Sequence, residues 1–130
     1  MAERADAAGL DALWVSDHLI IPKQTVSRYP DQADGEMPNT WKTTYYQPSS
    51  VLNYLAVKTQ NIRLGQSVLV LPMRNPIEVA SQIAKMDQLS DGRVNFGVGV
   101  GWFAEEFEAL GYPFKHRGAL ADEGLAICKA

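Results

Sequence analysis

Apolar and polar residues alternate most regularly between residues 93 and 102. Four apolar residues recur at every second position and therefore share one face of a strand: Val94, Phe96, Val98 and Val100. The opposite face has almost no side chains, because it carries Gly97, Gly99 and Gly101. Glycine weakens a strand and usually marks a place where another group approaches the backbone closely. We therefore expect a ligand or a bulky neighbouring side chain on this face.

The rest of the chain alternates between helical and strand patterns. Apolar residues at helical spacing predict helices over residues 2–8, 48–59, 76–89, 103–110 and from about residue 118 to the end. Strand patterns lie within residues 10–21 and 62–71, and the second contains the apolar run 68–71 that is typical of strands covered on both faces. Strict alternation predicts an α/β fold with a parallel sheet and right-handed crossovers.

Residues 23–47 form a long polar segment between the first strand and the second helix. This segment contains four aromatic residues: Tyr29, Trp41, Tyr45 and Tyr46. A loop of this length is usually a lid or a disordered segment. The aromatic residues favour a lid that packs on the site, although they could equally serve only to hold the loop down.

Polar or glycine residues occur where each predicted strand ends. These positions are Asp17-His18, Gln66-Ser67 and Gly101-Trp102. Parallel α/β folds place their sites at the carboxyl ends of the strands. A dinucleotide-binding turn is disfavoured, because its third glycine would fall at Trp102. We expect one site built from these three strand ends.

Composition narrows the class of protein. The chain has 130 residues, of which 46% are hydrophobic and 21% charged, so we expect one globular domain over residues 1–130. The net charge of -3 and the absence of a basic stripe argue against nucleic-acid or membrane-surface partners. One cysteine, Cys128, fits a reducing compartment, and together with the polar N-terminus it predicts a cytoplasmic protein.

Several segments, spread in order along nearly the whole chain, resemble the luciferase-like monooxygenase superfamily, and within it the oxidoreductases that use the deazaflavin coenzyme F420. They are residues 13–22, 27–30, 64–76, 89–93, 97–102 and 105–107. The resemblance implies a (β/α)8 barrel of which this chain supplies the first to the fourth helix, with parallel strands two to four. A complete barrel of this kind takes about 250 residues. The first strand and the second half, with most of the phosphate-binding residues, would then lie outside it.

The resemblance also implies roles for individual residues. Asp17 and His18 would lie beside the coenzyme ring, with His18 as a proton donor or electrostatic partner. Ser67-Val68 would form a bulge, often with a cis peptide bond, that supports the ring from behind. Gly101, Trp102 and Glu105 would surround the ring, and no metal ligand is implied. The relatives that oxidise sugar phosphates carry a catalytic glutamate at the position of Trp102, which argues against their chemistry here.

Three interpretations of function remain at this point. The first is hydride transfer between F420 and a small organic substrate, with His18 as the catalytic residue. The second is an FMN-dependent monooxygenase of the same superfamily. The third is a non-catalytic half-barrel that only associates with a partner. Three strands cannot close a barrel, so the open edges predict pairing with a second chain, as in a homo-oligomer. On residues alone, Asp17 could merely cap backbone amides, and Glu105 and Glu106 could merely favour a helix dipole.

Overall fold

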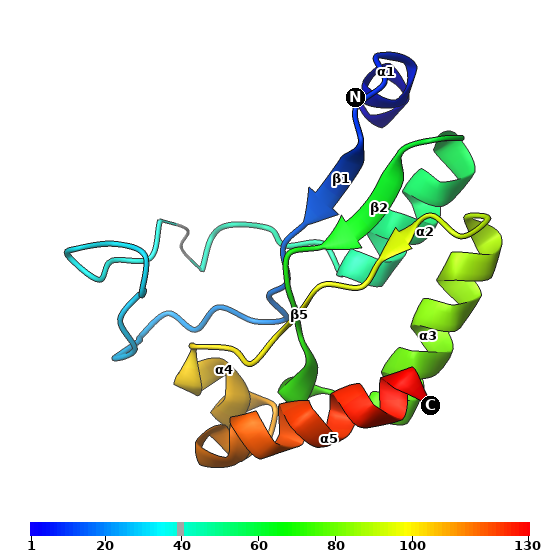
Figure 1. Ribbon diagram of the computed structural model, residues 1–130. Coiled ribbons are helices and arrows are strands. Elements are labelled where there is room, and N and C mark those ends of the chain that lie inside the picture. Colours follow the sequence, from blue (N-terminus) through cyan, green and yellow to red (C-terminus); the bar gives the residue numbers. More distant parts are fainter. Residues whose placement is uncertain (39–40) are drawn as a thin grey trace.

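The computed structural model describes residues 1–38 and 41–130 (Figure 1). Three parallel strands form the main sheet in the order β1-β2-β4: β1 Ala12–Val15, β2 Arg63–Gln66 and β4 Val94–Asn95. Two short strands, β3 Leu69–Val70 and β5 Val98–Gly99, pair in parallel as a second sheet. The predicted parallel α/β fold is therefore confirmed, and over the described residues the sheets do not close into a barrel.

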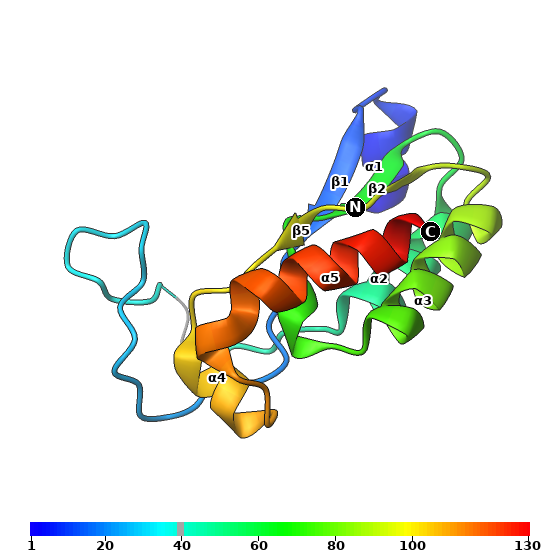
Figure 2. The ribbon, with the colours of Figure 1, turned by 60° about the horizontal axis from the view of Figure 1, so that its bottom comes forward.

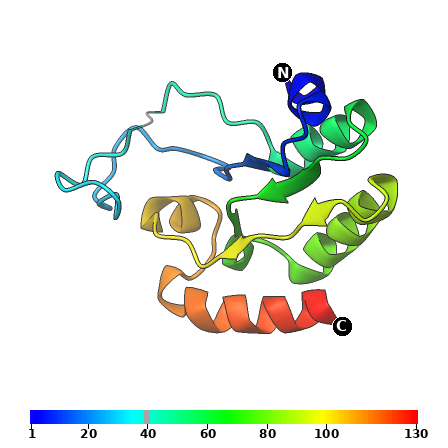
Figure 3. The same cartoon turned by 45° about the horizontal axis from the view of Figure 1, so that its top comes forward.

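Helices follow the strands in the predicted order. They are α1 Ala2–Ala7, α2 Pro48–Lys58, α3 Pro76–Leu89, α4 Ala104–Ala109 and α5 Arg117–Lys129, with short 3-10 turns η1 Leu71–Met73 and η2 Phe114–His116. Helices α2, α3 and α5 lie together on one side of the strands, and the long loop after β1 extends away from them (Figures 2 and 3). No helix in the described part of the chain is long and apolar enough to cross a membrane.

The strands are shorter than the sequence pattern predicts. The first ends at Val15 rather than near Ile21, because the backbone N–H groups of Leu19 and Ile20 donate to a side chain, Glu106, instead of to a strand. The pattern over residues 62–71 is divided into β2 and β3 by a cis peptide bond between Ser67 and Val68. The pattern over residues 93–102 is likewise divided into β4 and β5.

Two apolar clusters join the strands to the helices. One contains buried Leu52, Ala56, Ile62, Leu64 and Met86, from α2, the start and middle of the β2 region, and α3. The other contains Leu69, Leu71 and Val79, with Leu125 and Cys128 of α5 packed against them. Leu13 and Val15 of β1 are two residues apart, so they share one face of the strand, and both pack on the first cluster. Burial of these residues fixes the strand ends relative to the helices.

The glycine face of residues 97–101 packs against bulky neighbours. A Cβ atom on Gly97 would overlap the backbone carbonyl oxygen of Gln66, and one on Gly99 would overlap the side chain of Val68. A Cβ on Gly101 would lie 2.6 Å from Val70 Cγ1 and 2.7 Å from a ring carbon of Phe107. Close packing of backbone and side chains therefore accounts for these glycines.

The segment 89–93 ends α3 and carries a structural arginine. Asp91 and Gly92 both have positive φ angles, 57° and 76°, which turn the chain back toward β4. The Arg93 guanidinium then donates to the carbonyl oxygens of Ala56, Ile62 and Ser90. It thereby satisfies carbonyl groups at the end of α2 and in the loop before β2.

Candidate functional site

A cavity of about 470 Å³ lies at the carboxyl ends of the strands. Six of the seven predicted site residues line it: Asp17, His18, Ser67, Val68, Gly101 and Trp102. Its other walls come from the start of the loop after β1, from that loop's Tyr29 and Tyr45, from Gly99 at the end of β5 and from Val100 after it. The three strand ends that the sequence singled out therefore do meet at one place. Their roles toward a coenzyme stay a prediction.

Asp17 has a structural partner on each carboxylate oxygen. Its Oδ1 accepts a hydrogen bond from Arg74 Nη2 at 2.7 Å, and its Oδ2 accepts one from the backbone N–H of Val70 at 2.9 Å. The Asp17 side chain is fully buried, so this ion pair ties the end of β1 to β3 and the turn after it. Asp17 does cap a backbone amide, as one interpretation of the sequence proposed, but the amide is distant in sequence.

His18 is held by a buried carboxylate. Its Nδ1 lies 3.0 Å from Oε2 of Glu106, while Glu106 Oε1 accepts hydrogen bonds from the backbone N–H groups of Leu19, at 2.6 Å, and Ile20, at 3.1 Å. Glu106 is 1% exposed and the His18 side chain is 14% exposed. His18 is thus mostly buried, and its ring is held by the contact with Glu106.

Aromatic rings surround His18, and three aromatic residues of this group, Tyr29, Tyr45 and Trp102, line the cavity. Tyr45, Trp102 and Phe103 present edges or faces to the His18 ring in T-shaped contacts, with ring centroids 5.0, 6.4 and 6.2 Å away. Trp102 stacks on Phe103 at 4.8 Å, and Tyr29 meets Trp102 edge-on at 5.2 Å. Two aromatic residues of the long loop therefore pack on site residues, whereas Trp41 and Tyr46 are exposed. That the loop acts as a lid stays a prediction.

Glu105 does not line this cavity. Its Oε1 instead accepts hydrogen bonds from the backbone N–H groups of Val26 and Ser27. Partial burial alone would raise the pKa of Glu105. Hydrogen bonds have the larger, opposite effect and lower this pKa to about 2; they come from the Ser27 hydroxyl, from the backbone N–H groups of Val26 and Ser27, and from the backbone of Glu105 itself. Glu105 is therefore an anchor for the β1 loop, and the geometry lends no support to the predicted coenzyme contact.

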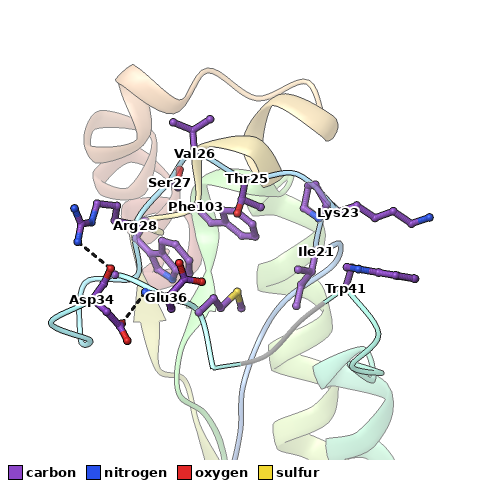
Figure 4. Close-up of a pocket in the computed structure, with 14 residues that line it drawn as sticks. Ile21, Lys23, Thr25, Val26, Ser27, Arg28, Asp34, Glu36, Trp41 and Phe103 are labelled. Atoms are coloured by element: carbon purple, nitrogen blue, oxygen red, sulfur yellow. Dashed lines mark hydrogen bonds between the residues drawn. The ribbon is translucent and has the colours of Figure 1, made fainter.

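A second cavity, of about 480 Å³, lies beside the first between the β1 loop and the start of α4 (Figure 4). Trp102 and Met37 line both cavities. The rim is held by Asp34, whose backbone oxygen accepts from Arg28 and whose carboxylate accepts from the N–H of Glu36. Among the described residues, no three His, Cys, Asp or Glu side chains gather where a metal ion could be held.

Known proteins match this chain from end to end. The profile of the luciferase-like monooxygenase family matches residues 1–130. The chain belongs to this family. An uncharacterised protein of Mycobacterium tuberculosis is 31% identical over 129 residues, which are 99% of this chain and 45% of the relative. An F420-dependent glucose-6-phosphate dehydrogenase of Amycolatopsis mediterranei is 32% identical over 132 residues, covering 98% of this chain and 35% of the enzyme.

Solved structures of luciferase-like enzymes share the fold. The oxygenating component of a 3,6-diketocamphane monooxygenase of Pseudomonas putida, solved with FMN, superimposes with a TM-score of 0.71 at 24% identity, over 98% of this chain and 30% of that chain. The resemblance inferred from the sequence is confirmed, and the fold is the predicted segment of a luciferase-like (β/α)8 barrel. The chain spans less than half the length of the curated relatives named above. Luciferase-like relatives include both F420-dependent and FMN-dependent enzymes.

Sequence reasoning missed two residues of the site. Glu106 lies next to Glu105 in the same matching segment, but only Glu105 was assigned to the coenzyme ring, and the helix dipole was the only role considered for Glu106. Arg74 followed the second strand pattern and was given no role. The sequence does not show which residues they contact. A buried carboxylate requires hydrogen-bond donors, and the donors to Glu106 and Asp17 come from residues more than 50 positions away in sequence.

Proposed function

We propose that this chain forms the coenzyme-ring part of an oxidoreductase that transfers hydride between F420 and a small organic substrate. The observation that carries the proposal is the 470 Å³ cavity at the strand ends, which brings His18, Ser67-Val68 and Trp102 together. The F420-dependent dehydrogenase among the relatives supports this choice of coenzyme. A catalytic role for the whole protein is part of the proposal.

The cavity suits a flat, mostly apolar ring with polar edges. Val68 and Val100 are 41% and 49% exposed and, with Trp102, supply apolar surface. Ser67 and His18 supply hydrogen-bonding groups on the same cavity. The volume of about 470 Å³ falls in the usual range of ligand pockets, roughly 300 to 1,000 Å³. These residues fit the ring of a flavin or deazaflavin.

Within this proposal the chain's own groups orient the ring and manage a proton. A bound deazaflavin supplies the hydride acceptor or donor. His18 lies on the cavity and exchanges the proton that accompanies hydride transfer with the substrate. Asp17, through Arg74, holds the end of β1 in place so that His18 stays on the cavity wall. Tyr45 and Trp102 pack around His18 and limit the access of water to it.

Binding titrations test the proposal. Purified protein is titrated with F420 and, separately, with FMN, and the bound fraction is followed by fluorescence. We expect saturable F420 binding that His18→Asn weakens by about fivefold, which corresponds to the loss of one hydrogen bond of about 1 kcal/mol. The chain's other histidine, His116, is exposed on η2, so His116→Asn is a matched control that leaves binding unchanged. Absence of saturable F420 binding would refute the proposal.

An FMN-dependent monooxygenase is the second candidate. A monooxygenase of Streptomyces nodosus, 31% identical over 111 residues, supports it. Tight FMN binding with weak F420 binding in the same titration would select this candidate. Association of the chain at rising concentration without binding of either coenzyme would instead select the non-catalytic half-barrel.

A further inference from the structure

We propose that Glu106 is a positioning residue that holds His18 as the tautomer with its proton on Nδ1 and leaves Nε2 as a hydrogen-bond acceptor. The proposal rests on one juxtaposition: a carboxylate, 1% exposed, whose two oxygens contact the His18 ring and the two backbone amides that follow it. The positioning of Nε2 for catalysis rests on the proposed function above. The tautomer itself does not depend on any coenzyme.

The donors and acceptors around Glu106 determine where the His18 proton lies. Oε1 receives the backbone N–H groups of Leu19 and Ile20, so charge-assisted hydrogen bonds hold the carboxylate in one orientation. Oε2 then faces Nδ1 of His18 at 3.0 Å. A carboxylate only accepts hydrogen bonds, so Nδ1 must donate. In a neutral imidazole only one nitrogen carries the proton, and Nε2 is therefore unprotonated.

The surroundings of the ring oppose a 180° flip about the Cβ–Cγ bond, which would put Cδ2 in the place of Nδ1. Tyr45, Trp102 and Phe103 contact the ring from several sides, and the ring is mostly buried. A flip would also replace the Nδ1–Glu106 contact and leave a buried carboxylate oxygen without its donor, which is costly. Because His18 lines the cavity, Nε2 is the ring nitrogen available to accept a hydrogen bond from an O–H or N–H group bound there.

The substitution Glu106→Gln tests this proposal directly, because it keeps the shape of the side chain and changes only its hydrogen-bonding groups. The backbone N–H groups of Leu19 and Ile20 require an acceptor, so they bind the side-chain oxygen of the new glutamine. The side-chain NH2 group of that glutamine then faces His18. An NH2 group only donates, so Nδ1 must become the acceptor and the proton must move to Nε2. The variant should invert the tautomer without removing the ring or its aromatic contacts.

The test is ¹⁵N NMR of the histidine rings in the protein without coenzyme. Spectra are recorded at increasing pH until the ring ¹⁵N shifts stop changing, and the tautomer is assigned on that plateau, where the ring is neutral. We expect wild-type His18 to show a protonated Nδ1 and an unprotonated Nε2, and Glu106→Gln to show the reverse. Glu108→Gln removes an exposed acid from the same helix and should leave the wild-type pattern.

Two results would overturn the proposal. The first is a wild-type His18 with its proton on Nε2, or with both tautomers equally populated; this measurement needs no variant. The second is a folded Glu106→Gln protein with an unchanged tautomer. Failure of the proposed function would look different: the tautomer would behave as expected while F420 did not bind saturably. If both hold, Glu106→Gln should also lower the affinity for F420 about fivefold, as expected for one lost hydrogen bond.

Discussion

Replacing Gly97 by alanine tests whether the glycine face exists for packing or for a ligand. The new Cβ would overlap the carbonyl oxygen of Gln66 and lie 3.2 Å from its carbonyl carbon. These are backbone atoms of the neighbouring strand, so no side-chain rotation can relieve the clash. Overpacking of this kind costs about 1–3 kcal/mol, and a rigid backbone partner places Gly97→Ala near 3 kcal/mol.

Urea denaturation measures this loss as a decrease in the free energy of unfolding. Gly118→Ala is the matched control, because Gly118 lies in α5 and an added Cβ there meets nothing within 4 Å. Alanine is the better helix former, and Gly118 lies in the first turn of α5, so Gly118→Ala should stabilise the protein by at most about 0.5 kcal/mol and the two substitutions should act in opposite directions. If Gly97→Ala left stability within about 0.5 kcal/mol of wild type but abolished coenzyme binding, the packing explanation would be wrong.

Two further predictions concern ionised groups of the site region. Arg74→Met should lower the free energy of unfolding in urea by about 3 kcal/mol, because it leaves the buried Asp17 carboxylate without its cation. Adding Asp17→Asn should recover part of this loss. A loss below about 1 kcal/mol for Arg74→Met would contradict a buried ion pair. The folded-state pKa of Glu105 is lowered from 4.5 to about 2, so its bonds to Val26 and Ser27 stabilise the fold above pH 4.5 and are lost as the pH falls toward 2. The amide proton shifts of Val26 and Ser27 should titrate with a midpoint near 2, Glu105→Gln should abolish this titration, and a midpoint near 4.5 would contradict it.

Periodic patterns predicted the elements of this fold better than their ends. The helical stripe of α3 is an example, since Val79 and Met86 are buried and Asn75 caps the helix by accepting from the N–H groups of Ile77 and Glu78. Strand lengths were overestimated because a run of apolar residues indicates that side chains are buried, but not that the backbone is hydrogen-bonded to a neighbouring strand. Residues 19 and 20 continue the apolar run of the first strand, yet their amides bind a carboxylate 86 or more positions away. No local pattern encodes such a partner.

The adjacent acids of α4 show why the site itself was only partly predictable. Successive residues of a helix point about 100° apart, so Glu105 and Glu106 must serve different neighbours. Which of them faces His18 depends on how the β1 loop crosses the start of α4, and that path is set by the hydrogen bonds of the two acids themselves. One acid holds the loop at residues 26 and 27, and the other holds it at residues 18 to 20. The loop that carries His18 is thus fastened at two points by one helical turn. Any substitution that shifts that turn should move the catalytic candidate and the wall of the second cavity together.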